Sequence, residues 1–597
     1  MKTFVKSALA LGITTAITLS TANAATYEVI DKGAATQFKF TYSQQENNAG
    51  QTAISGSEGY NFPVQFQYFD EDDYDAIVTF INNSHELVHG LNDVEDETAL
   101  RAGNPTANDL AWVVRFLQSR NSSTARLYFQ VVGDTVAMLN DGTTTEEVVV
   151  FDEKFVGTDT YTRSTIDYVN GITNQGWLYG NASAPFLPTD FVDSEDNDVT
   201  FWTREFDTRG FFSPDGGQTI IPLLPTEATY GGESAILDIS DTNIAVGYAS
   251  TSIAENATNY ITDETGGCKD PEVTKNVPEE VCIRNYRTKA VSLDLSVDNG
   301  DSSIYNSEAH LWQLDSNGQL SATALGHLVT PHEDDSREFK SFAQAVNDNG
   351  VAVGFAHGWV DENRTDIRNG EPRRYYAVVY KNGTVQDFTE DHSELFSQRA
   401  YDINNDGIAV GYTSKYINGD LRTKFFYVDT NADNMEMVLP TDFFVGSSSV
   451  ATAINEAGKV VGHGEVETHN DSSSNPRRTN GFIFDKNTDT FTNLNDLLAC
   501  DSPYTIIEAR HINDNDEISA SAIVKQQRRD AKGELMVDDS GEPITEDVIR
   551  AVTLKPTNGE IEDCSEVEEK IERQGAGFGI ASVLLLSLVQ LRRRIFK

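Results

Sequence analysis

The sequence predicts an all-β protein built from repeats, most simply a β-propeller of six to eight blades, with seven as the expected number. A short pattern, Ala-x-x-Ile-Asn-x-x-Gly-x-x-Val-Gly, recurs along the chain in variants. Each copy is followed by a polar loop and an aromatic strand, so that about 50 to 60 residues hold roughly four short strands, the content of one propeller blade. A parallel β-solenoid, whose rungs are shorter and more regular, is the alternative.

Three copies of the pattern are clean and three are degraded. The clean copies contain Asn347, Gly350 and Gly354; Asn404, Gly407 and Gly411; and Asn455, Gly458 and Gly462, and the degraded ones contain Ile172, Gly176 and Gly180; Ile239, Asn243 and Gly247; and Asn513, Asp516 and Ala520. An Asn side chain folds back on its backbone and Gly accepts positive φ, so each copy predicts a hairpin. The wide gap after Gly247 indicates a decayed copy or an insertion that holds Cys268 and Cys282.

The N-terminus has the pattern of a secretory signal peptide. Lys2 and Lys6 precede an apolar run, and Ala22-Asn23-Ala24 supplies a small-residue cleavage site. We therefore expect residues 1–24 to be removed on export. The mature chain would then hold a β-rich region over 25–225, with a small helical insertion near residues 70–120, and a repeat region over 226–564.

The C-terminus predicts a membrane-spanning segment. After an acidic linker at 565–574, an uncharged stretch runs from Gly575 to Leu591 and ends at the cluster Arg592-Arg593-Arg594. Its 17 residues are at the lower edge of the ~17 to 25 that cross a bilayer as a helix, and the basic flank should stay cytoplasmic. We expect the tail at 575–597 to hold the protein at the inner membrane, with the rest of the chain in the periplasm, at the cell surface or outside the cell.

This tail resembles the GlyGly-CTERM type of sorting signal of Gram-negative bacteria, although it opens with Gly-Ala-Gly in place of a Gly-Gly pair. The resemblance implies a tail-processing intramembrane protease as a partner. The segment Glu308-Ala309-His310-Leu311-Trp312, together with the repeated hairpin, resembles the HAF-type extracellular repeat. The segments 494–500 and 508–514 resemble a family of large secreted bacterial proteins classed as a domain of unknown function. These resemblances imply a location and a repeat, and no reaction.

The four cysteines fit an exported protein. Their even number and the absence of C-x-x-C spacing give no support to a zinc ribbon or to thioredoxin chemistry. Of the three possible pairings, we expect Cys268 with Cys282 across a polar loop, and Cys500 with Cys564 as a clamp on the last part of the fold.

Composition excludes one class of partner. The formal net charge is −48, from 45 Lys and Arg against 93 Asp and Glu. Because a phosphate backbone attracts a basic footprint, we expect no nucleic-acid binding.

One segment is a candidate metal site. His85-Glu86-Leu87-Val88-His89 matches H-E-x-x-H, in which two histidines one helical turn apart bind zinc and the Glu activates water. This chemistry requires a helix, and residues 76–91 fit one, although Asn82-Asn83-Ser84 also fits a loop. No third ligand stands at a known spacing. A solvated or structural pair of histidines is the alternative.

Other catalytic patterns are missing from the sequence, which has no nucleophile elbow, P-loop or dinucleotide fingerprint. Acidic clusters at 70–73, 193–198 and 298–301 offer oxygen ligands for calcium, but none follows the D-x-D-x-D-G rule. The pattern of Leu110, Trp112, Val113, Phe116 and Leu117 predicts the buried face of a helix.

We therefore predict a non-enzymatic secreted or cell-surface module whose loops bind an extracellular protein or polymer. An extracellular zinc metallohydrolase using His85, Glu86 and His89 is one alternative, and a structural or adhesive envelope component is another. The cofactor is open, with calcium and zinc as the candidates.

Overall fold

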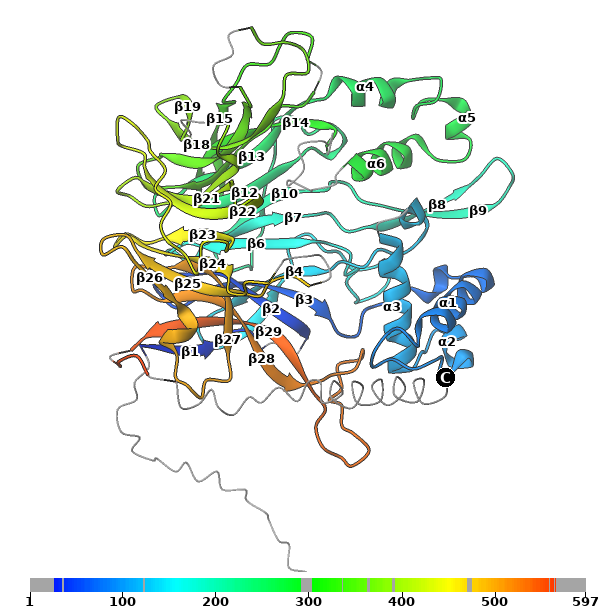
Figure 1. Cartoon of the computed structure of the whole chain (residues 1–597). Coiled ribbons are helices and arrows are strands. Elements are labelled where there is room, and N and C mark those ends of the chain that lie inside the picture. The colour runs from blue at the N-terminus through cyan, green and yellow to red at the C-terminus, as the bar shows by residue number, and fades with distance from the viewer. Residues whose placement is uncertain are drawn as a thin grey trace, which may run out of the picture.

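The computed structural model of the chain describes residues 26–34, 37–121, 124–290, 303–335, 337–361, 366–388, 392–469, 475–557, 559–562 and 564. Within these residues, seven small antiparallel sheets surround a common axis, as Figure 1 shows. The predicted propeller is confirmed, and so is the expected number of seven blades.

Each blade is a meander whose first strand lies innermost, against the first strands of its neighbours. Blade 1 consists of β2 (Phe38–Glu46), β3 (Thr52–Gly59), β4 (Thr135–Asn140) and β5 (Thr145–Val148); blade 2 of β6 (Asp167–Ile172), β7 (Leu178–Ala182), β10 (Arg209–Ser213) and β11 (Ile221–Leu223); and blade 3 of β12 (Ser234–Ile239), β13 (Ile244–Ile253), β14 (Tyr305–Asp315) and β15 (Gly318–Gly326).

The remaining blades follow the same order, and the last one closes the ring. Blade 4 consists of β16 (Ser341–Val346), β17 (Ala352–Trp359), β18 (Arg373–Lys381) and β19 (Thr384–Asp387); blade 5 of β20 (Phe396–Ile403), β21 (Ile408–Ile417) and β22 (Asp420–Asp429); blade 6 of β23 (Ser449–Ile454), β24 (Lys459–Glu465), β25 (Thr479–Asp485) and β26 (Thr490–Asn493); and blade 7 of β27 (Thr505–Ile512), β28 (Ile518–Gln527), β29 (Thr545–Pro556) and β1 (Tyr27–Asp31). The N-terminal strand β1 thus pairs antiparallel with β29 and joins the two ends of the propeller.

The recurring Asn-x-x-Gly pattern forms the turn between the first two strands of a blade. In blade 5, the Asn404 side-chain oxygen accepts the backbone N–H of Ile408 at 3.0 Å, and the Gly407 N–H donates to the Asn404 carbonyl at 3.0 Å. Gly407 has φ 80°, a conformation in which glycine carries no steric penalty. The motif therefore encodes a tight turn, as the sequence predicts.

The same asparagine also joins neighbouring blades, which the sequence does not reveal. Its side-chain N–H donates to the carbonyl of the equivalent residue in the next blade, from Asn347 to Asn404 at 3.1 Å, from Asn404 to Asn455 at 3.2 Å and from Asn455 to Asn513 at 3.3 Å. Asn47 donates in the same way to Thr173 at 3.0 Å. The asparagine of each such copy thus has two roles, because its side chain caps its own turn and also hydrogen-bonds the next blade.

Asn47 marks a seventh copy of the pattern, which was not among the six predicted from the sequence. It is followed by Gly50, with φ 80°, but Ile54 occupies the place of the closing glycine, and residues 60–134 separate β3 from β4. Blades 1 and 2 both precede residue 226, so the propeller includes strands of both the 25–225 and the 226–564 regions.

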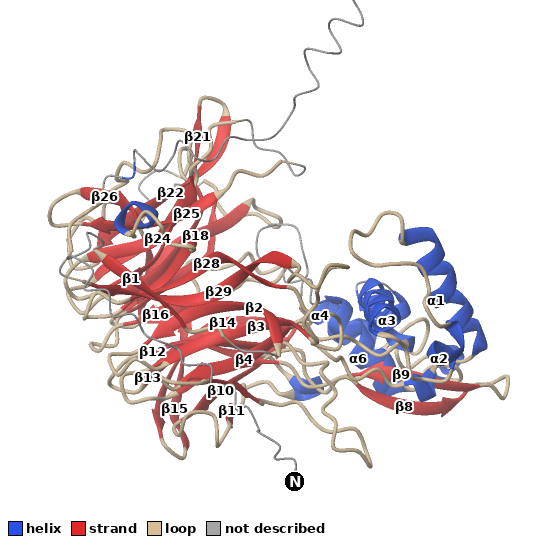
Figure 2. Cartoon of the chain, turned by 90° about the horizontal axis from the view of Figure 1, so that it is seen from below, coloured by secondary structure: helices blue, strands red, loops and turns tan. Residues whose placement is uncertain are grey.

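Long insertions emerge on the face opposite these turns, where the second strand of a blade connects to the third (Figure 1 and Figure 2). The first, which we call the helical lobe, spans residues 60–134 and contains η1 (Phe66–Tyr68), α1 (Glu71–Ser84), α2 (Glu97–Arg101), α3 (Ala107–Asn121) and η2 (Thr124–Tyr128). Others hold the hairpin of β8 (Leu187–Val192) and β9 (Asp198–Thr203), and the helices α4 (Glu255–Thr262), α5 (Pro271–Thr274) and α6 (Glu279–Ala290). Two short helices, η3 (Thr229–Gly231) and η4 (Leu494–Leu497), lie elsewhere.

The helical lobe has a hydrophobic core of its own. Trp112, Val113, Phe116 and Leu117 are fully buried, and Leu110 is 4% exposed, which confirms the predicted buried face of this helix. The helices expected near residues 70–120 are therefore present. The wide gap between the third and fourth repeats is an insertion, and it holds Cys268 and Cys282 together with α4, α5 and α6.

Candidate functional site

A large cavity lies between the helical lobe and the propeller. Its volume is about 1970 Å³, above the roughly 300–1,000 Å³ usual for small-molecule pockets. It is lined by β2, β3 and β6 of the propeller, by α3 and the segments around it, and by the connection between β28 and β29 at 528–544. We call it the insertion cavity.

Helix α3 presents one polar stripe to the insertion cavity. Asn108, Ala111, Arg115 and Gln118 all line it, as expected for residues three or four positions apart on one helical face. The opposite face of α3 packs into the lobe core. Because Ala111 has a small side chain, the helix backbone lies close to the cavity at the middle of this stripe.

The connection at 528–544 forms a wall that is bonded to the lobe. The Arg528 guanidinium donates to the carbonyl of Gly90 at 3.2 Å, Lys532 donates to that of Pro105 at 2.8 Å, and the Asn61 N–H donates to Ala531 at 2.7 Å. Arg529 donates to the carbonyl of Gly533 at 2.6 Å. The bonds of Arg528, Lys532 and Ala531 to the lobe join segments more than 400 residues apart in the sequence and fix the two sides of the cavity.

Tyrosines and amides from inner strands form the floor. Tyr42 and Gln44 of β2 and Tyr168 and Asn170 of β6 line the cavity, with Arg510 of β27 beside them. Tyr168 is 47% exposed, so a large part of its ring is available to a ligand. Burial raises the pKa of the Tyr42 phenol, which keeps it a neutral hydrogen-bonding group.

Several carboxylates of the cavity already have partners within the protein. Glu147 forms a bidentate ion pair with Arg163, and the Glu546 carboxylate lies 3.2 Å from the Lys39 ammonium group. The Asp530 side chain accepts the backbone N–H groups of Lys532 and Glu534 at 2.9 and 3.0 Å. Arg115, in contrast, is exposed on α3.

A second polar site lies in the propeller channel, at the end where the repeated turns converge. A chain of hydrogen-bond contacts crosses four blades: the Gln45 side-chain nitrogen lies 3.2 Å from Nε2 of His511, and the Tyr179 hydroxyl lies 2.9 Å from each of two acceptors, the side-chain oxygens of Gln45 and Asp238. Asp238 also accepts the N–H of Val346 at 2.9 Å, and Asp402 accepts that of Ile454 at 2.8 Å. These side chains bond the backbone of neighbouring blades, which gives them a structural role.

The Asp402 carboxyl makes the stability of the fold pH-dependent. Burial, and then repulsion from Asp238, raises its pKa from 3.8 to about 7. Because the folded pKa is the higher one, this contribution to stability is complete below pH 3.8 and is lost as the pH rises through 7. We expect Asp402→Asn to remove on the order of 1–3 kcal/mol of the pH dependence of the unfolding free energy between pH 5 and 8, measured by urea titration.

The matched control is Asp241→Asn, at an exposed carboxylate near the same turns. The wild type and this control should lose stability in parallel as the pH rises. A pH profile of Asp402→Asn identical to theirs would contradict the assignment.

The H-E-x-x-H segment does not lie on a helix. Helix α1 ends at Ser84, His85 is its C-cap, and residues 86–90 form turns. The segment Asn82-Asn83-Ser84 consists of weak helix formers, which explains the end of the helix there. His85 bonds the Ile81 carbonyl at 3.3 Å, whereas His89 lines the insertion cavity. The helical geometry expected of a zinc motif is therefore wrong, and metal binding by His85, Glu86 and His89 stays an untested prediction.

Two of the acidic clusters have local structural roles. Asp70 caps α1 and exchanges hydrogen bonds with Asp73, and Asp193 accepts the N–H groups of Glu195 and Asn197 within its own turn. The cluster at 298–301 lies outside the described residues.

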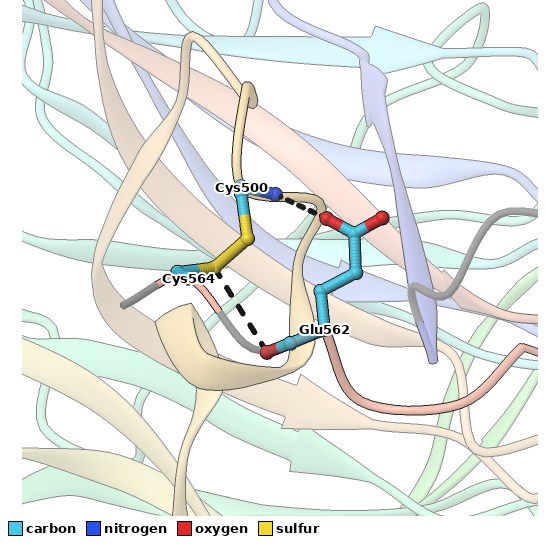
Figure 3. Close-up of side chains that lie close together, drawn as sticks. All are labelled: Cys500, Glu562 and Cys564. Atoms are coloured by element: carbon cyan, nitrogen blue, oxygen red, sulfur yellow. Dashed lines mark hydrogen bonds between the residues drawn. A yellow bond between two sulfur atoms is a disulfide. The ribbon is translucent and has the colours of Figure 1, made fainter. Parts of the chain in front are cut away.

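Both predicted disulfides are present. Cys268 bonds Cys282 within the third insertion, and Cys500 bonds Cys564 across 64 residues. The Cys500 N–H also donates to the Glu562 carboxylate at 2.8 Å, as Figure 3 shows. Among the described residues, Cys500, Glu562 and Cys564 are the one group of potential metal ligands that lie close together. Its two sulfur atoms are bonded to each other, so they are not thiolate ligands for a metal ion.

No helix in the part of the chain that the structure describes is long and apolar enough to cross a membrane. The expected signal peptide at 1–24 and the expected tail at 575–597 lie outside the described residues.

Among the candidate site residues predicted from the sequence, His89 lines the insertion cavity, whereas the polar stripe of α3 and the pair Arg528-Arg529 were not predicted. The stripe of Asn108, Ala111, Arg115 and Gln118 is visible as the complement of the predicted buried face of α3. The pair Arg528-Arg529 is also visible in the sequence. Neither signal indicates that the two segments face each other, because that depends on the closure of blade 7 beside blade 1.

The chain was compared with known proteins. A family model described as a protein of unknown function (DUF3466) matches residues 3–594, and the chain therefore belongs to this family. A comparison with curated proteins finds no match. Among solved structures, a puromycin-hydrolyzing peptidase of Mycobacterium tuberculosis is similar at 11% sequence identity and a TM-score of 0.20, over 65% of this chain and 54% of that chain. The match spans about half of that protein.

Proposed function

We propose that this member of the family is a binding module that holds its ligand in the insertion cavity, between the helical lobe and the propeller. The observation that carries the proposal is the cavity of about 1970 Å³, whose floor belongs to the propeller and whose wall at 528–544 is hydrogen-bonded to the helical lobe. Ligands bind preferentially in concave sites between domains, on loops that a rigid scaffold positions.

The lining favours binding over catalysis. It combines tyrosines, amides and arginines with His89 and eight carboxylates, and Glu147, Asp530 and Glu546 among these carboxylates are engaged in ion pairs or turns. A general acid or base needs a proton-transfer group that faces the ligand with a suitable pKa.

We also propose that the protein is exported and that it works outside the cytoplasm, held at the inner membrane by its C-terminal tail until a protease processes it. The N-terminal signal pattern, the basic flank of the tail and two disulfides support this location, since disulfides persist in oxidising compartments.

A variant with a bulky side chain on the cavity-facing side of α3 tests the proposed function. Neutral and acidic oligosaccharides, oligopeptides and nucleotides are added to the purified full chain, and the melting temperature is measured. We expect one class to stabilise the wild type by about 2.7 kcal/mol at a hundredfold excess over its Kd, and we expect Ala111→Trp to abolish this effect because the indole would project from the middle of the α3 stripe into the space next to Arg115 and Gln118.

Ser119→Trp is the matched control, since Ser119 is exposed on the same helix and does not line the cavity. It should respond like the wild type. Binding of equal strength to Ala111→Trp, or no stabilisation by any compound class, would refute the proposal.

A further inference from the structure

We propose that the ligand of the insertion cavity is an acidic oligosaccharide, whose carboxylate groups pair with the guanidinium groups of Arg115, Arg528 and Arg529. This inference rests on the proposed function and names the chemical class of the ligand. It is drawn from the charge distribution, the shape and the side-chain chemistry of the cavity.

The first argument is that three arginines of the cavity have no carboxylate partner among the described residues. Among the residues that the structure describes, carboxylates outnumber cations, yet no carboxylate forms an ion pair with Arg115, Arg528 or Arg529. Arg528 and Arg529 donate to backbone carbonyls of Gly90 and Gly533. These bonds hold the guanidinium groups in place and leave further N–H donors for a ligand, because each guanidinium has five.

The second argument is the geometry that guanidinium groups recognise. A guanidinium donates two parallel hydrogen bonds to one carboxylate, and such charge-assisted pairs are the strongest polar contacts in proteins. Arg115 comes from α3 and the other two from the wall, so the cationic groups stand on two sides of one space. A ligand that carries several carboxylates along its length fits this distribution better than a single small anion.

The third argument separates a saccharide from a peptide. The lining is rich in phenol and amide groups, from Tyr42, Tyr60, Tyr168, Gln44 and Gln118. Tyrosine offers a flat apolar face and a polar hydroxyl together, as a ring with many hydroxyl groups requires. A peptide ligand, in contrast, relies on pockets for its side chains or on an added strand.

The net charge of the whole chain limits where an acidic ligand can bind. The net charge of −48 disfavours acidic polymers over most of the surface. In the cavity, eight carboxylates and seven Lys and Arg side chains nearly balance, and the guanidinium groups of Arg115, Arg528 and Arg529 can attract a carboxylate at short range.

Calorimetric titration of the full chain tests the inference with three probes: a hexameric oligogalacturonate, maltohexaose as an uncharged hexasaccharide, and hexaglutamate as an acidic peptide. We expect the oligogalacturonate to bind, and the two other probes to bind at least tenfold more weakly. The double variant Arg528→Gln/Arg529→Gln and the single variant Arg115→Gln should each weaken binding about tenfold or more, the effect of losing one charge-assisted contact.

Arg478→Gln is the matched control, because Arg478 is an exposed arginine that does not line the cavity. It should bind like the wild type, and melting curves verify that every variant is folded. Equal binding of hexaglutamate, binding of maltohexaose alone, no binding of the oligogalacturonate, or binding that the arginine variants do not change would each overturn the inference. The proposed function would still stand if another compound class bound the wild type and not Ala111→Trp.

Discussion

Replacing Gly411 by alanine is expected to lower the free energy of unfolding by about 3 kcal/mol or more. Gly411 is the closing glycine of the blade 5 repeat, on β21, and it pairs with Ala400 of the inner strand. A Cβ atom at this position would lie 1.9 Å from the carbonyl oxygen of Arg399, which is part of the backbone and has little freedom to move. The equivalent glycines Gly247 and Gly354 meet a carbonyl oxygen at the same distance.

Urea unfolding of the purified variant, followed by circular dichroism, measures this effect. Gly446→Ala is the matched control, because a Cβ atom there meets its nearest neighbour, Phe444, at an ordinary 3.6 Å. Its stability should change by no more than about 0.5 kcal/mol. Losses of equal size in both variants would show that close approach of strands is not the reason for the closing glycine.

Replacing both Cys500 and Cys564 by serine is expected to destabilise the propeller by about 4 kcal/mol. The disulfide closes 64 residues that include β27, β28 and β29, three of the four strands of blade 7. Blade 7 is also where the N-terminal strand β1 joins the C-terminal part of the chain. Without the crosslink, the unfolded chain has more conformations available, and the segment that closes the ring loses a covalent restraint.

Urea titration measures the loss of stability, and hydrogen exchange locates it. Exchange should accelerate in β1 and β29 of this variant. The comparison is Cys268→Ser/Cys282→Ser, which removes a crosslink inside the third insertion, and exchange should accelerate there alone. In wild-type protein isolated from cells, both disulfides should be formed, so that no thiol reacts with an alkylating reagent after unfolding. An unchanged stability without the Cys500–Cys564 crosslink would contradict the closing role.

Most of the fold was predictable because the repeat is a local signal. Asn404, Gly407 and Gly411 act within one hairpin, and their spacing is fixed by the geometry of that turn. The copy at Asn47 escaped detection because Ile54 stands at the closing position and the helical lobe interrupts the blade. The disulfide pairs were predictable because loop proximity limits the choices among four cysteines.

The candidate site was much less predictable, and the H-E-x-x-H segment does not have the helical geometry that its chemistry requires. H-E-x-x-H has chemical meaning on a helix, and the helix ends before the motif begins. The blades, their turns and their crosslinks follow from the amino-acid sequence, since each depends on residues close together or on a repeated spacing. The pairing of the insertions depends on the three-dimensional fold: Arg115 and Arg528 line one cavity because ring closure places blade 7 beside blade 1, and no local pattern records that contact.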